Sequence, residues 1–398
     1  MKVDKITPEF LAFFLAILGI PIGYYFKDTS MNLAFLGEVF ILLLKVLIVP
    51  LVMSSIFLAV TNIKFNDLKK LGSHTIAYYL TTSALACIVG LCLANFMGLG
   101  YIDGMASHAN FKAGEVESFS LTSLFVSFFS GNIIKSLAEG NIIQLIVFTF
   151  IFAFGTLSLK EESRRPLVVL ASSVQEVIMS LIKWIITFIA PIGVFSLVAN
   201  LVAQTDLKIF VGFSSLFIAI AIAIFIHACI TLPAIGYFVG KFNPVKFVVQ
   251  VKEALVVALT TASSAATLPI SMRVVKSNAG VKDKTSDFIL PIGATLNMDG
   301  SALYQSIVIL FLAEMAGISL DLSQQILVFF FVMMSSAGTA GVPNGGIIMM
   351  GAVMGMLGIP LEYLGIYLLI DRIWDYPVTM VNVFGDLIGA KTVDRFTN

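Results

Sequence analysis

The chain has 398 residues, of which 58% are hydrophobic and only 12% are charged, and its formal net charge is zero. Because soluble domains carry about 25% charged residues, this composition predicts an all-α polytopic membrane protein. The neutral charge balance argues against a nucleic-acid partner, and the isolated histidines and the spacing of the three cysteines match no metal site.

Six apolar runs in the first 240 residues predict membrane-spanning helices. They lie near residues 8–26, 34–61, 72–98, 120–158, 167–203 and 208–240. The runs at 120–158 and 167–203 are longer than one membrane thickness, so we expect them to be tilted, broken or partly interfacial. No small-residue cleavage site follows the first run, which predicts a retained helix and not a signal peptide.

Basic residues are distributed unevenly between the loops. They lie between the second and third runs, between the fourth and fifth, and after the sixth, at Lys64, Lys69, Lys70, Lys160, Arg164, Arg165, Lys241, Lys246 and Lys252. The opposite loops are poor in basic residues. Because Lys- and Arg-rich loops stay in the cytoplasm, we expect both termini to be cytoplasmic and the polar segment 99–119 to be extracellular.

Two later regions, 244–276 and 321–357, are too long for one helix and too short for two full spans. Small and polar residues lie at the centre of each, and both strings contain Ser-Ser-Ala-x-Thr followed by a proline. Such strings also allow close helix packing, but two matched strings favour two re-entrant helical hairpins. The charges at their bases predict entry from opposite faces, an inverted repeat that indicates a secondary transporter.

The motif Asn297-Met298-Asp299-Gly300 interrupts the apolar helix predicted at 284–315. A carboxylate in hydrocarbon is unfavourable unless something pairs with it, and an intact helix would direct Asn297 and Asp299 to opposite faces. Glycines flank the motif. We therefore expect the helix to be broken here, so that Thr295, Asn297, Asp299 and backbone carbonyls converge on a cation.

The helix predicted at 361–390 carries a polar stripe. At about 100° per residue, one face collects Asp371, Asp375, Thr379, Asn382 and Asp386. This face is expected to line the bundle interior or a wet cavity, although Asp371 and Arg372 could instead pair structurally near an interface. Asp375 and Asp386 have no matching cations in the sequence, which predicts that their counter-ions are ligands. Hard oxygen ligands favour Na⁺.

These motifs resemble those of the glutamate transporter family, the dicarboxylate/amino acid:cation symporters, in its bacterial or archaeal form. The resemblance runs from the first span to Asp386 and includes Thr-Leu-Pro, Asn-Met-Asp-Gly, Gly-Thr-Ala-Gly-Val-Pro and Asn-Val-x-Gly-Asp. It implies eight transmembrane helices plus two re-entrant hairpins, and an elevator-type transporter that forms a homotrimer in the inner (plasma) membrane. The implied scaffold covers 1–71 and 120–207, and the implied transport domain covers 72–98 and 208–398.

The same resemblance implies that Na⁺ is the co-transported ion and that it has three sites. The first is implied to use Asp386 with groups near Gly293, Asn297 and Asn382. The second is implied to use backbone at Thr295, Ser336, Ala337 and Thr339, and the third Asp299 and Asn297 with Tyr79, Thr82 and Ser83. The substrate is implied to meet Ser263, Ser264, Met298, Thr339, Gly341, Asp375, Val378, Thr379 and Asn382, with Asp375 facing its amino group.

Two departures from the family pattern concern the cargo and the coupling ion. Acidic-substrate members carry an Arg at the position of Val378, and some carry one at the position of Ala262. A buried substrate carboxylate without that donor is disfavoured, so we expect a neutral, small or apolar amino acid. Animal excitatory members carry a Glu where this chain has Gln305, which cannot titrate. We therefore expect no obligatory H⁺ or K⁺ coupling.

Other classes of function stay open at this point. The first is an acidic amino acid or dicarboxylate symporter coupled to Na⁺ or H⁺, because Arg372 could reach an acidic side chain. The second is an ion channel, since polar-lined helices also form pores. An intramembrane enzyme is not expected, because Ser263 and Ser264 have no His or Lys base nearby in the sequence. The expected partners are an amino acid and the lipid bilayer.

Overall fold

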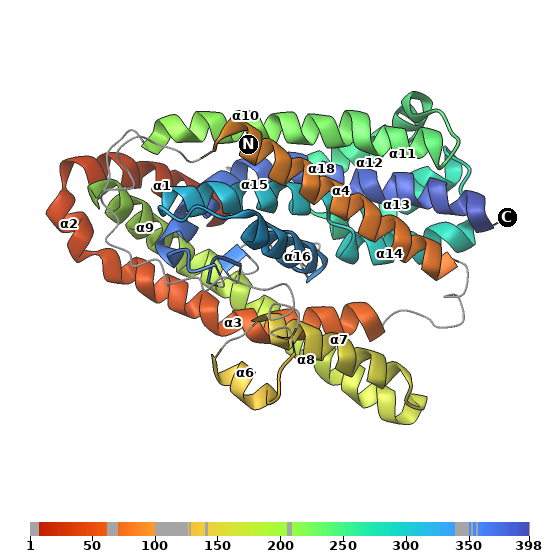
Figure 1. Cartoon of the computed structure of the whole chain (residues 1–398), viewed down its shortest axis with the longest axis horizontal. Helices are drawn as coiled ribbons and strands as arrows, with labels where there is room; N and C mark the ends of the chain where they lie inside the picture. Colours follow the sequence, from red (N-terminus) through yellow and green to blue (C-terminus); the bar gives the residue numbers. More distant parts are fainter. Residues whose placement is uncertain are drawn as a thin grey trace, which may run out of the picture.

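The computed structural model describes residues 8–61, 71–99, 126, 129–139, 142–204, 209–338, 350–351, 353–355 and 357–397. Within these ranges every regular element is a helix and none is a strand, which confirms the predicted all-α class. Figure 1 shows an elongated bundle whose helices mostly run along the long axis, with the C-terminus at one end.

One group of helices comes from the first half of the chain. It comprises α1 (Pro8–Tyr25), α2 (Lys27–Asn32), α3 (Ala34–Thr61), α6 (Ile133–Glu139), α7 (Ile142–Leu157), α8 (Glu161–Phe188) and α9 (Ala190–Gln204). α3 packs against α7, α8 and α9, and α1 packs along α9. α1 and α9 lie so close at Gly23 that a Cβ there would overlap the backbone of Ala199. The long run predicted at 167–203 is therefore broken, between α8 and α9 at Ile189.

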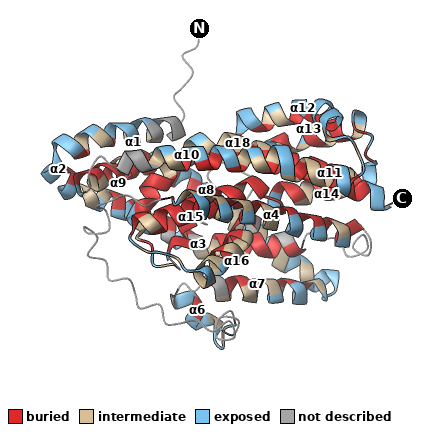
Figure 2. Ribbon diagram, turned by 45° about the horizontal axis from the view of Figure 1, so that its top comes forward, coloured by how far each residue is buried: buried red, intermediate tan, exposed pale blue. Residues whose placement is uncertain are grey.

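A second group comes from α4 and the second half of the chain. It comprises α4 (Ser73–Met97), α10 (Ile209–Ile226), the π-helix η3 (His227–Thr231), α11 (Leu232–Phe238), α12 (Pro244–Thr261), α13 (Ser264–Ser277), α14 (Asp283–Leu296), α15 (Asp299–Met315), α16 (Leu322–Gly338), η4 (Leu361–Tyr363), α18 (Leu364–Asp394) and η5 (Arg395–Thr397). α15 is packed by α4, α10, α16 and α18. A helix that is apolar all round must be buried, and almost every residue of α15 is (Figure 2).

The region predicted as the first hairpin, 244–276, folds as two helices that pack against each other. α12 ends at Thr261, and Ala262 after it has a left-handed backbone with φ of 49°. The Ser263 hydroxyl accepts a hydrogen bond from the Ala266 amide, 3.2 Å away, and so caps α13. In the second region, α16 forms the first arm, and the string from Thr339 onward lies outside the described residues. Re-entry of both regions into the membrane stays a prediction.

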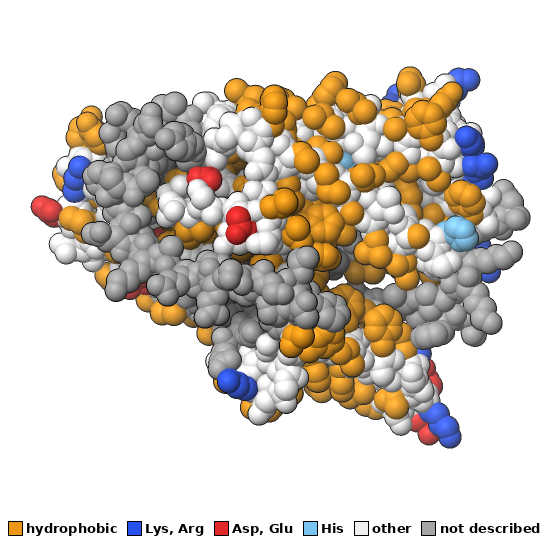
Figure 3. All heavy atoms as spheres, in the orientation of Figure 1, with side chains coloured by type: hydrophobic (Ala, Val, Ile, Leu, Met, Phe, Trp, Pro, Cys, Tyr) orange, Lys and Arg blue, Asp and Glu red, His pale blue; other side chains and the backbone are white. Residues whose placement is uncertain are grey.

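Within the part of the chain that the structure describes, five helical segments are long and apolar enough to cross a membrane. They are Lys27–Leu58, Ser73–Met97, Glu161–Phe188, Phe213–Phe238 and Asp283–Met315. Hydrophobic side chains cover much of the face seen in Figure 3, and the Lys and Arg side chains on that face gather mainly at the end that carries α11, α14 and the C-terminus. This distribution is that of an integral membrane protein. The predicted count of eight spans stays a prediction.

Candidate functional site

A break interrupts the buried helical segment formed by α14 and α15. α14 ends at Leu296, Asn297 and Met298 have non-helical backbone, and α15 begins at Asp299. The break predicted from the sequence at this motif is therefore present. Asn297 and Asp299 are completely buried, and Met298 nearly so. Both α4 and α18 pack against α14 and α15, the two helices that flank this break.

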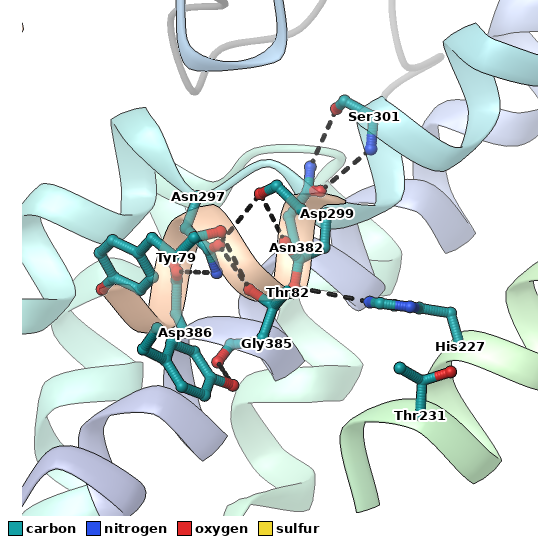
Figure 4. Close-up of polar contacts among 12 residues, drawn as sticks. Tyr79, Thr82, His227, Thr231, Asn297, Asp299, Ser301, Asn382, Gly385 and Asp386 are labelled. Atoms are coloured by element: carbon teal, nitrogen blue, oxygen red, sulfur yellow. Dashed lines mark hydrogen bonds and ion pairs between the residues drawn. The ribbon is translucent and has the colours of Figure 1, made fainter. Parts of the chain in front are cut away.

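Four side chains meet on the α4 side of the break. The Ser83 hydroxyl donates to Asp299 Oδ1 at 2.7 Å, and the Thr82 hydroxyl donates to Asn297 Oδ1 at 3.2 Å. The Ser83 oxygen also lies 3.4 Å from Asn297 Oδ1. Two hydroxyls, one amide oxygen and one carboxylate oxygen thus face one another, and Figure 4 labels Thr82, Asn297 and Asp299 among them. This set contains only hard oxygen ligands and a single carboxylate, which suits a cation such as Na⁺.

Asn297 also connects this cluster to α18. Its amide nitrogen donates to Asp386 Oδ1 at 3.0 Å, so one side chain joins the two acidic positions. One turn earlier in α18, the Asn382 oxygen accepts from the Ser301 amide at 3.2 Å and its nitrogen donates to the Ser301 hydroxyl at 3.2 Å. Asn382 therefore ties α18 to the first turn of α15, directly after the break.

Glycines allow the backbones to approach at this point. A Cβ on Gly293 would overlap Asp386 Oδ1 and the Tyr79 hydroxyl. A Cβ on Gly385 would lie 2.6 Å from Asp299 Oδ2. The Tyr79 hydroxyl donates to the Ile289 carbonyl at 2.8 Å, so Tyr79 lies beside Gly293 and Asp386. The neighbouring side chains approach the backbone so closely at Gly293 and Gly385 that only glycine fits at these two positions.

Two of the residues implied for the second Na⁺ site, Thr295 and Ser336, carry hydroxyls that bond within their own helices. The Thr295 hydroxyl donates to the Ile292 carbonyl at 3.0 Å, and the Ser336 hydroxyl donates to the Met333 carbonyl at 3.0 Å. Both bonds stay within one helix, although α14 and α16 pack against each other. Ala337 is the next-to-last residue of α16, and Thr339 lies outside the described residues.

Those residues implied for the substrate that the structure describes lie on α18, at the start of α13 and at the break. Val378 and Thr379 are buried, Thr379 lies one helical turn after Asp375 in α18, and Ser264 is buried at the start of α13. The carbonyl of Val378 faces Gly300, where a Cβ would overlap it. Gly341 lies outside the described residues. Met298, which is implied for the substrate, is buried and stands in the sequence between Asn297 and Asp299, which are implied for Na⁺.

Two contacts of this site were missed by sequence reasoning. The Tyr78 hydroxyl donates to the Gly385 carbonyl at 3.0 Å, and His227 Nε2 lies 3.5 Å from Asp299 Oδ2. Tyr78 reads in the sequence as an ordinary packing residue beside Tyr79. His227 was set aside as isolated, although Pro233 after it signalled an irregular helix.

Comparison with known proteins finds one family and several amino acid transporters that this chain resembles. The sequence profile of the sodium:dicarboxylate symporter family matches residues 10–396. The chain is 31% identical over 405 residues to a proton/sodium-glutamate symport protein of Geobacillus stearothermophilus, covering 98% of this chain and 95% of that protein. It is 29% identical over 415 residues to a proton/glutamate-aspartate symporter of Escherichia coli (strain K12), covering 100% and 94%. It is also 30% identical over 401 residues to the neutral amino acid transporter B(0) of Oryctolagus cuniculus, covering 92% and 74%.

Proposed function

Because the chain belongs to the sodium:dicarboxylate symporter family, we propose that it is a Na⁺-coupled symporter of a neutral amino acid. Its family and relatives make it a membrane transporter that moves an amino acid together with Na⁺ or H⁺, and not an enzyme. The proposal adds the identity of the ion and the class of the amino acid.

Na⁺ coupling is carried by one observation, the meeting of Asn297 and Asp299 with the Thr82 and Ser83 hydroxyls. Each hydroxyl can turn a lone pair toward a cation, since its proton is free to rotate. The site is buried, so the Asp299 charge needs a partner. Na⁺ supplies that partner when it binds. Three such ions complete the proposal, with the other two near Asp386 and near Thr295 and Ser336.

A neutral substrate is supported by the side chain of Val378. Arg is the residue that binds a carboxylate through two parallel hydrogen bonds, and Val378 is buried and apolar where acidic-substrate members have that Arg. Ala262, the other position, is also apolar. Asp375 remains available for a substrate ammonium group, with Thr379 beside it and Ser263, Ser264 and Asn382 near the carboxylate end.

A second candidate is an acidic amino acid symporter. Arg372 lies over the ring of Tyr376, with its guanidinium carbon 5.3 Å from the ring centroid, and it stands between Asp371 and Asp375 in the sequence of α18. A substrate side-chain carboxylate that reached this guanidinium would not need Val378. The names of two relatives, which specify glutamate, favour the same candidate.

We further propose that transport follows an elevator mechanism in a homotrimer. Residues 1–71 and 120–207 would form the scaffold, and 72–98 and 208–398 would form the moving transport domain. Na⁺ binding would raise the affinity for the amino acid, and by reciprocity the amino acid would raise the affinity for Na⁺. Both termini would be cytoplasmic, in the plasma membrane.

The proposal is tested by a thermal-stability screen of the purified protein. Neutral and acidic amino acids are added one at a time, with Na⁺ or with choline as the cation. A ligand that binds the folded state raises the melting temperature by mass action, so we expect a neutral amino acid to stabilise the protein in Na⁺ only. Stabilisation by glutamate or aspartate alone would support the second candidate, and stabilisation without Na⁺ would contradict the proposed coupling.

A further inference from the structure

A buried histidine faces the carboxylate at the centre of the site. His227 Nε2 lies 3.5 Å from Asp299 Oδ2, and both side chains are completely buried (Figure 4). Within the described part of the chain, neither His227 nitrogen nor Asp299 Oδ2 has a hydrogen-bond partner. Buried polar atoms are rarely left without partners, so a donor and an acceptor facing each other are the natural pair.

The backbone that presents His227 is unusual. Residues His227–Thr231 form a π-helix between α10 and α11, and the Leu232 amide donates to the His227 carbonyl five residues earlier. Pro233 follows directly, and a proline removes one hydrogen bond from a helix and displaces the carbonyl four residues before it. The Thr231 hydroxyl lies 3.4 Å from the Ile226 carbonyl. Short π segments are rare and recur at functional sites.

The π segment packs against α4 and α18, the two helices that hold the cation cluster. His227 thus approaches Asp299 from the side opposite to Ser83, because Ser83 binds Oδ1 and His227 faces Oδ2. Gly385 also lies against Oδ2 and contributes no side chain there. Oδ2 is therefore enclosed, and His227 is the side chain in the described structure whose N–H can reach it.

We propose that His227 is a positioning residue for the cation site: its imidazole donates an Nε2–H hydrogen bond to Asp299 Oδ2 and so directs Oδ1 toward the ion. This inference rests on the proposed function, in which Asp299 binds Na⁺. A second partner behind an ion-binding carboxylate fixes its orientation, and removing such a partner from metal sites weakens binding about 10–100-fold. The same donor also satisfies an oxygen that would otherwise be buried alone.

Three variants separate positioning from packing. His227→Gln places an amide N–H near the position of Nε2, whereas His227→Asn places the same amide group near the position of Nδ1, out of reach of Asp299. His227→Leu keeps apolar volume and offers no donor. Gln and Asn form the matched pair, because they share their chemistry and differ in reach.

Na⁺ binding is measured on the purified protein without substrate, as the Na⁺ concentration that gives half of the rise in melting temperature, with choline keeping the ionic strength constant. We expect this concentration to stay within about threefold of wild type in His227→Gln and to rise about tenfold or more in His227→Asn and His227→Leu. Uptake assays add the substrate KM at saturating Na⁺, which we expect to change by less than about threefold in all three variants.

The outcomes distinguish the two proposals. If wild type responds to Na⁺ but Gln and Asn variants respond alike, or the Leu variant matches wild type, the role of His227 is overturned and Na⁺ coupling stands. If the melting temperature of the wild-type protein does not change with Na⁺, and the protein takes up its substrate without Na⁺, the proposed coupling and the role of His227 both fail. A variant that does not fold is recognised by its low melting temperature without Na⁺, and the comparison then rests on the Gln and Asn pair in membranes, with Na⁺-dependent uptake as the readout.

Discussion

Gly385 illustrates how a single missing side chain shapes the site. A Cβ at this position would lie 2.6 Å from Asp299 Oδ2 and 3.1 Å from Asn297 Nδ2. Gly385→Ala should therefore displace both ion-cluster side chains. Overpacking of this kind costs about 1–3 kcal/mol, so we expect the Na⁺ concentration for half-maximal uptake to rise about tenfold.

The matched control for this prediction is Gly155→Ala in α7, where nothing lies within 4 Å of the new Cβ. Alanine favours a helix over glycine by about 1 kcal/mol, so this variant should keep the wild-type Na⁺ dependence and gain stability. If Gly385→Ala had the same Na⁺ dependence as Gly155→Ala, a side chain at position 385 would not disturb the cation site, and the prediction would be contradicted.

Val378 is the residue on which the choice of substrate depends. Val378→Arg places a guanidinium beside Thr379 and Asp375, where it can bind a substrate carboxylate. We expect the variant to take up aspartate or glutamate and to lose uptake of neutral amino acids, measured with radiolabelled substrates in proteoliposomes. Val378→Met, which adds length without charge, should gain no acidic uptake. Failure of the Arg variant to gain any acidic uptake would count against the assignment of this position.

At the scale of elements, the turn between α12 and α13 concentrates strain at one residue. Ala262 adopts φ of 49°, a left-handed conformation that disfavours a residue with a Cβ. Ala262→Gly removes this strain, and glycine also makes the unfolded chain more flexible. We expect a net stabilisation of about 0.5–1 kcal/mol, measured as a higher melting temperature in detergent.

The control for the turn is Ala77→Gly, which lies in the interior of α4 on an exposed surface. Glycine in a helix interior should lower stability by about 1 kcal/mol. The two substitutions are chemically identical, so opposite signs would establish that backbone conformation decides the effect. A destabilised Ala262→Gly variant would contradict the strained turn.

How much of these elements could be predicted depends on the kind of signal. α3, Ala34–Thr61, coincides with the run predicted at 34–61, since its length and apolar composition alone define it. The break at Asn297 was predictable because a buried carboxylate needs a polar turn. The meeting of Thr82 and Ser83 with Asn297 and Asp299 came only from the family resemblance, because helical periodicity places residues on a face without identifying what that face touches.

At the scale of the whole molecule, the contacts that escaped prediction join segments far apart in the chain. Tyr78 reaches Gly385, and His227 reaches Asp299, each across a helix–helix contact. One sequence holds no direct record of which helices are neighbours, so a lone Tyr or His reads as packing. Pro233 did carry a local signal, since a proline within an apolar span predicts a distorted helix next to it.

The coupling ion is a property of the whole transport cycle. Gln305 is buried in α15 and its side-chain oxygen accepts a hydrogen bond from the Ser335 hydroxyl at 3.0 Å. An amide cannot carry a proton through a cycle, so this position joins α15 to α16 without supplying a titrating group.

We expect proteoliposomes with an inward proton gradient and no Na⁺ to accumulate no amino acid, whereas an inward Na⁺ gradient at equal pH drives accumulation. Gln305→Glu supplies a titrating group at the same place and should make uptake depend on pH. Accumulation by the wild-type protein in the Na⁺-free proton gradient would overturn Na⁺ as the coupling ion.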